Sequence, residues 1–265
     1  MPNAQPLTKT NAILDTLSPS MNAGEMLLSE FTLRMLKRDI GRLPDAAQSL
    51  TLSGVIAFLE DNVDLGHKLC EEALEMEPTS AFSWLNYAHV VFHKGFLLMH
   101  REILERAFLN AMTHPRIIKV AAINSAVWLD VGLLSRSIAQ AQKEGLDLSV
   151  PPLSIANVKF EQIKALPSEV QNDLEFISKL CLRIADARKC PGLGSFIESS
   201  ILGTHAFCYY TDVKNPQVLS DMNIELYSLM ADADLHESDC SGFFLAKPGT
   251  SETAVDGGDL INVDQ

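Results

Sequence analysis

The sequence has few basic residues, few cysteines and no long apolar run, and each shortage argues against a class of protein. Lysine and arginine number 21 against 34 acidic residues, which gives a net charge of −13. A chain this acidic is not expected to bind nucleic acid or an anionic membrane non-specifically. No apolar run approaches the roughly 18 residues that a membrane-spanning helix needs. The first residues lack a basic cluster followed by an apolar core, so no secretion signal is expected.

The five cysteines are scattered, and none forms a Cys-x-x-Cys pair. An odd, dispersed set is typical of a reducing compartment rather than a disulfide framework, so a cytoplasmic location is predicted. The 265 residues, 47% of them apolar, are enough for one large domain or two modest ones.

The N-terminal region is predicted to be a flexible segment followed by a helix. Residues 1–21 are polar and interrupted by proline, which favours a loose chain. Asn22 and Glu25 then form a capping-box pattern, which predicts a helix that ends at Gly41. The apolar stripe of this helix would consist of Leu27, Leu28, Phe31, Met35 and Leu36.

Small residues recur every 34 positions after this helix. The two clearest columns are Gly54, Ala88, Ala122 and Ala73, Ala107, Ala141. A small residue at a fixed place lets two helices of a hairpin pack closely, so these columns predict repeated helical hairpins. The predicted repeats are 47–80, 81–114 and 115–148, and capping helices are expected within 154–189. An irregular α-helical bundle is the alternative.

This spacing resembles the tetratricopeptide repeat (TPR) family. In the first repeat, Gly54, Gly66, Ala73 and Pro78 match the Gly, small, Ala and Pro positions of the family pattern. In the second repeat, the Trp, small, turn-Gly and Ala positions are matched by Trp84, Ala88, Gly95 and Ala107. The family's first-helix aromatic is replaced by Ala57, Val91 and Ser125. The resemblance implies a mainly α fold, a TPR-like helical-hairpin superhelix with a capping helix. Composition and short β-prone runs, described below, add a small α+β module and an acidic tail after it.

The resemblance also implies a non-enzymatic adaptor, chaperone or regulator that binds a protein segment on a concave face. The first helix of each repeat would line that face. The predicted partner-binding residues are Phe58, Phe82, Leu85, Asn86, His89, Phe92, His93, Arg116, Lys119 and Ile123. The opposing interpretation is that the N-terminal helix or the C-terminal module covers the face.

Residue patterns of common enzymes are missing. The sequence has no glycine-rich phosphate loop with its lysine, no Gly-x-Ser-x-Gly elbow and no His-Glu-x-x-His motif. His89 and His93 are four residues apart and could share a metal ion, but no acidic partner follows at the expected spacing. No cofactor, no metal and no catalytic residue is therefore predicted.

The last part of the chain is strongly acidic. From Cys190 onward there are twelve acidic and two basic residues. Residues 191–247 are predicted to form a small α+β module, because 206–211 and 242–246 are aromatic and β-prone, and 248–265 a disordered acidic tail. The stretch 224–230 fits a strand or a helix.

Two further functions stay open for this module. It could be a small hydrolase or metal-dependent enzyme positioned by the repeats, if its polar side chains converge in a pocket. The residues concerned are His205, Asp212, His236, Asp239 and Cys240. Alternatively, its carboxylates could bind a basic partner, an association that would weaken as salt rises.

Overall fold

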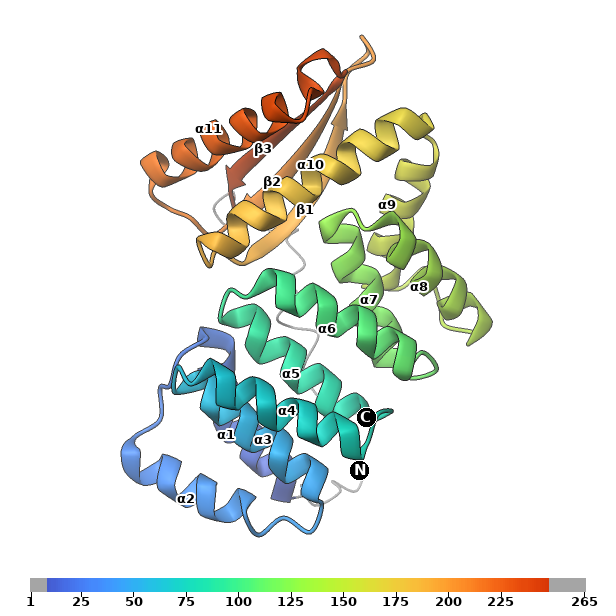
Figure 1. Cartoon of the computed structure of the whole chain (residues 1–265). Helices are drawn as coiled ribbons and strands as arrows, with labels where there is room; N and C mark the ends of the chain where they lie inside the picture. Colours follow the sequence, from blue (N-terminus) through green and yellow to red (C-terminus); the bar gives the residue numbers. More distant parts are fainter. Residues whose placement is uncertain (1–8, 248–265) are drawn as a thin grey trace, which may run out of the picture. The chain divides into compact units, whose positions relative to one another are not determined.

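The computed structural model describes residues 9–247. That part of the chain contains eleven α-helices and three β-strands, so the protein is mainly α with a small sheet near its C-terminal end, as predicted (Figure 1). Two compact units divide the chain, Met1–Ala111 and Met112–Gln265. The predicted boundary near Cys190 lies inside the second unit, between its last long helix and the sheet.

The first unit is entirely helical over its described residues. Its helices are α1 (Lys9–Ala23), α2 (Glu30–Ile40), α3 (Ala46–Leu59), α4 (Val63–Met76), α5 (Ala81–His93) and α6 (Leu97–Asn110). Two antiparallel hairpins, α3 with α4 and α5 with α6, form its body. The side chains of Asp45, Asn62 and Ser80 accept a backbone N–H at the starts of α3, α4 and α5, which stabilises each start.

The first hairpin is packed too closely for a side chain at two positions. A Cβ atom on Gly54 would lie 2.6 Å from Cys70 Sγ, and one on Gly66 would lie 2.5 Å from a ring carbon of Phe58. The ring of Phe58 is fully buried, so it has no space into which to move. The prediction that small residues mark the seams between helices is therefore confirmed at these positions.

The second unit joins a third hairpin to the α+β module. Its elements are α7 (Pro115–Trp128), α8 (Val131–Lys143), α9 (Leu153–Lys164), α10 (Ser168–Ala187), β1 (Gly192–Ser199), β2 (His205–Thr211), α11 (Pro216–Asp232), η1 (Leu235–Glu237) and β3 (Cys240–Ala246). Helix α9 packs against both α7 and α8, and α10 packs against β2 and β3. The ambiguous stretch 224–230 is helical, within α11.

The sheet has the order β1-β2-β3, with β1 and β2 antiparallel and β2 and β3 parallel. Side chains from helices bond to the outer edge of each outer strand. On α9, Lys159 Nζ donates to Ser195 O (2.9 Å) and Gln162 Nε2 to Ile197 O (3.0 Å). On α11, the Asn223 amide donates to Phe244 O (3.1 Å) and accepts from Phe244 N (2.8 Å). These bonds satisfy backbone groups that an unpaired edge would leave open.

The N-terminal prediction was wrong in two respects. Residues 9–21, expected to be flexible, belong to α1, which buries Ile13, Leu17 and Met21. The helix expected to begin at Asn22 begins at Glu30 instead, because Ser29 and not Asn22 is its N-cap. The predictions for residues 1–8 and for the acidic tail at 248–265 lie outside the described residues. Across 9–247, no helix combines the length and apolar character needed to cross a bilayer.

Candidate functional site

Helix α1 lies on the first helices of the two N-terminal hairpins. It packs against α3 and α5 (Figure 1), on a surface that we call the α3–α5 face. Its buried apolar side chains, Ile13, Leu17 and Met21, are spaced by four residues and so form one stripe along the helix. The first helices predicted to bind a partner segment therefore already hold an amphipathic helix of the same chain.

Polar contacts fix both ends of α1. Near its start, the Thr10 hydroxyl donates to Gln48 Oε1 of α3 (2.8 Å). Near its end, Asn22 Oδ1 lies 2.9 Å from His89 Nε2 of α5. The chain then passes so close to α5 that a Cβ on Gly24 would lie 2.2 Å from the backbone oxygen of His93. Gly24 also has a φ of +67°, a conformation that favours glycine.

The predicted first-unit residues differ in accessibility. Phe58 is 0% exposed and packs against Gly66 and, at 5.9 Å between ring centroids, Tyr87, so its assignment to a free binding surface was wrong. The residue lies in the seam, where its ring fills the space left by a glycine. Three further residues of the predicted set are buried: Leu85, Asn86 and His89. The other three are half-buried: Phe82, Phe92 and His93.

A cluster of rings lies at the C-terminal end of α5. His89 and His93 have ring centroids 4.4 Å apart, and Phe92 lies 5.0 Å from His100 of α6. Burial, with His93 and His100 nearby, holds the pKa of His89 well below its usual value, so His89 is neutral at pH 7. A neutral ring that carries its proton on Nε2 donates to Asn22 Oδ1. Among residues 9–247, no three potential metal-binding side chains are arranged to hold an ion.

The remaining predicted binding residues, Arg116, Lys119 and Ile123, are on α7 in the second unit. Arg116 and Lys119 are half-buried, and Ile123 is buried. Desolvation lowers the pKa of the Arg116 guanidinium from its usual value of 12.5. Arginine keeps its charge at neutral pH in spite of such a shift, so α7 presents cationic groups there.

Among the residues of the hydrolase alternative, Asp212 lies apart from His205, Asp239 and Cys240. These three are neighbours, because His205 N donates to Asp239 O (2.8 Å) and His205 is paired with Cys240 across β2 and β3. His205 is the first residue of β2 and Asp212 follows its last residue, Thr211, so a strand rise of about 3.3 Å per residue separates the two by roughly 20 Å. The His205 Nδ1 atom lies 2.8 Å from Ser199 Oγ across the strand pair. Cys240 is buried, and burial raises the pKa of its thiol, which opposes its use as a nucleophile.

A buried lysine in the second unit was not predicted. Lys159 Nζ donates to both the backbone oxygen and, at 2.5 Å, the Oγ atom of Ser195, and Ser195 Oγ in turn donates to Val127 O. Burial lowers the pKa of Lys159 to about 7. The serine proton points at a carbonyl rather than at the amine, so the pair ties α7, α9 and β1 together instead of activating a nucleophile. Its signal in the sequence was a lysine in the buried stripe that contains Ala156 and Ile163.

No protein-family model, no curated protein and no solved structure matches the chain.

Proposed function

We propose that this protein is a TPR-like interaction scaffold (an adaptor, chaperone or regulator) that binds an amphipathic helix of a protein partner. The regular spacing of the hairpins supports a TPR-like array. Their first helices begin at residues 46, 81 and 115, and their second helices at 63, 97 and 131. Hairpins of this length, repeated at 34 to 35 residues, are typical of the TPR family.

The single observation that supports helix binding is the occupancy of the α3–α5 face by α1. The contact combines a short apolar stripe with one side-chain hydrogen bond near each end. A partner helix with the same arrangement would bind by displacing α1. The half-buried side chains at Phe82, Phe92 and His93 would extend its contact surface.

Such a partner competes with a helix that is tethered in place. The tether gives α1 a high effective concentration at the face, so a free helix binds weakly until α1 is released. A substitution can release α1. Leu17 is fully buried, and a glutamate in its place would be too costly to bury, so its carboxylate would favour a detached α1 in which it is exposed to water. Ser18 is the next residue and is exposed, so it provides a matched control position.

We expect Leu17→Glu to open the α3–α5 face, and Ser18→Glu to leave it closed. A fluorescent peptide that reproduces residues 9–24 should bind the Leu17→Glu protein at least tenfold more tightly than the wild type or the Ser18→Glu protein. Fluorescence anisotropy measures the binding. Hydrogen exchange on the same proteins should show loss of amide protection in α1 but not in α3 to α6.

Two results would contradict the proposal. The first is an open α1, seen by hydrogen exchange, with no peptide binding, because the face would then lack affinity for a helix in trans. The second is loss of protection throughout α3 to α6 in Leu17→Glu, which would make α1 part of the core of the unit. A peptide with Leu17 replaced by glutamate serves as the negative control for binding.

A further inference from the structure

Two of the exposed apolar surfaces outside the α3–α5 face, one in each unit, differ in the charge of their surroundings. The first is the turn between β1 and β2, residues 200–204, which we call the β1–β2 tip. Ile201 is 103% exposed and Leu202 is 87% exposed, the highest values among the large apolar residues in the described part of the chain. Burying two exposed aliphatic side chains against a partner would lower the free energy, because their apolar surface would leave water. The tip is therefore a candidate contact surface.

The β1–β2 tip is held in one conformation by its own hydrogen bonds. The Ser200 hydroxyl accepts from the backbone N–H of Leu202 (3.1 Å) and of Thr204 (3.2 Å), and pairs with the Thr204 hydroxyl (2.7 Å). The Ser200 N–H donates to Thr204 O (2.8 Å), and Gly203 adopts a φ of +85° to close the turn. A preformed turn loses less entropy when a partner binds it.

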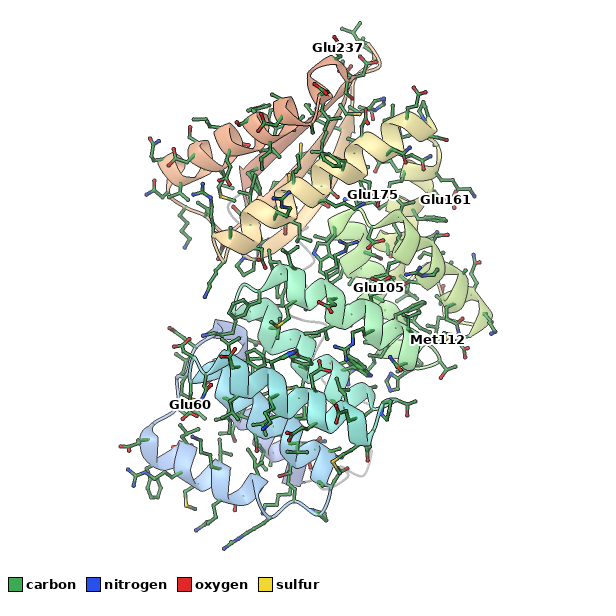
Figure 2. The ribbon with its side chains drawn as sticks, in the orientation of Figure 1. Glu60, Glu105, Met112, Glu161, Glu175 and Glu237 are labelled. Carbon is green, nitrogen blue, oxygen red and sulfur yellow. The ribbon has the colours of Figure 1, made fainter. Side chains whose placement is uncertain are left out.

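The surroundings of the tip are acidic. Glu198, near the end of β1, and Asp239, whose backbone oxygen accepts from His205 N (2.8 Å), are both exposed. Glu237 of η1, labelled in Figure 2, belongs to the same end of the sheet, because β3 begins opposite His205. The tip therefore fits an apolar surface with cations at its rim.

The second surface is on α2, where exposed apolar side chains are flanked by basic rather than acidic residues. Phe31, which is 74% exposed, and Met35 lie four residues apart on α2 and form an exposed apolar row, which we call the α2 ridge; Leu27, also exposed, lies in the loop before the helix. Arg34 and Arg38 flank it on the next turns. Arg34 pairs with Glu30 at 2.6 Å and Arg38 with Asp39 at 3.9 Å, but surface ion pairs of this kind contribute little to stability and can be exchanged for other partners.

We propose that the β1–β2 tip of one copy docks on the α2 ridge of a second copy. Ile201 and Leu202 would cover Phe31, while the carboxylates near the tip would face Arg34 and Arg38. The contact joins two different surfaces, so it is heterologous, and further copies can add at each free end. It uses neither α1 nor the α3–α5 face, and therefore does not rest on the proposed function.

Sedimentation of the full-length chain at rising concentration tests the proposal. The wild type should show an average mass that grows beyond a dimer from the low to the high micromolar range. Leu202→Asp and Phe31→Asp should each remain monomeric throughout. Val158→Asp provides the control, since Val158 is also strongly exposed (69%) but lies outside both surfaces. Circular dichroism confirms that all three variants are folded.

Mixing the two monomeric variants gives the sharper result. The Leu202→Asp chain keeps its α2 ridge and the Phe31→Asp chain keeps its tip, so an equal mixture should form dimers and nothing larger. Higher salt should weaken these dimers, because charges contribute to the contact. Monomeric wild type at every concentration would overturn the proposal. So would a mixture that stays monomeric, association that survives either substitution, or loss of association in Val158→Asp.

Discussion

Replacing Gly66 by alanine should destabilise the first unit by about 1–3 kcal/mol, the usual effect of overpacking a tight core. The added methyl group would lie 2.5 Å from the ring of Phe58, which is buried and cannot move away. Helix propensity acts in the opposite direction, since alanine is favoured over glycine in a helix by up to about 1 kcal/mol. The steric term is expected to win because neither helix of the seam can shift without breaking contacts elsewhere.

The matched control is Gly132→Ala in α8. Gly132 is an exposed helical glycine whose Cβ would meet nothing closer than 3.7 Å, so the same substitution there should be neutral or stabilising. Opposite signs at the two sites are the expected outcome. Chemical denaturation can report on each unit separately, because one tryptophan, Trp84, lies in the first unit and the other, Trp128, in the second. Equal effects of the two substitutions would show that the seam tolerates a side chain.

The stability of the second unit should rise between pH 7 and pH 9 through Lys159. In the folded state the amine has a pKa of about 7, and in the unfolded state it returns to its ordinary value near 10.5. Between these values the unfolded chain binds the extra proton, so raising the pH favours folding by up to about 1.4 kcal/mol per pH unit. Over two pH units the expected gain is about 2 kcal/mol.

Lys159→Met removes this dependence, because methionine does not titrate. The difference in unfolding free energy between wild type and Lys159→Met should therefore shift by about 2 kcal/mol in favour of the wild type from pH 7 to pH 9. Cys208 is the ionisable neighbour that opposes the shift of the Lys159 pKa, so a Cys208→Ala background keeps the comparison simple. Lys164→Met, at an exposed position on the same helix, provides the control for removing a lysine from α9. A pH-independent difference for Lys159→Met would mean that the amine keeps its proton when buried.

The hairpins could be predicted from the sequence because the constraint on them is local. A residue such as Gly54 or Ala107 must be small to let the helices of one hairpin meet, and that requirement repeats with the hairpin. Strands β2 and β3 were also predictable, from their short aromatic runs, whereas β1 has no such run and was not predicted. Such features depend on residues close together in the chain.

Features that depend on distant contacts could not be predicted. Helix α1 contains Pro19 and many polar residues, so its sequence alone indicates a loose segment. Its packing against α3 and α5 provides the stabilisation that its low helix propensity does not. Phe58 was placed on a binding surface because its column matched the family pattern, but the space above Gly66 holds its ring. The hydrogen bonds of Lys159 depend on where β1 lies, 36 residues further along the chain.

The side chains bonded to the sheet edges affect how readily this protein can aggregate through its sheet. Asn223 offers Phe244 the same donor and acceptor that an incoming strand would offer, and Lys159 with Gln162 occupies the carbonyls at the other edge. A three-stranded sheet rich in aromatic residues with unpaired edges would be a template for strands of other chains and for fibril growth. Because polar side chains occupy these backbone groups at both edges, the sheet cannot template the addition of another strand there. Aggregation through the sheet would first require α9 or α11 to detach from its edge.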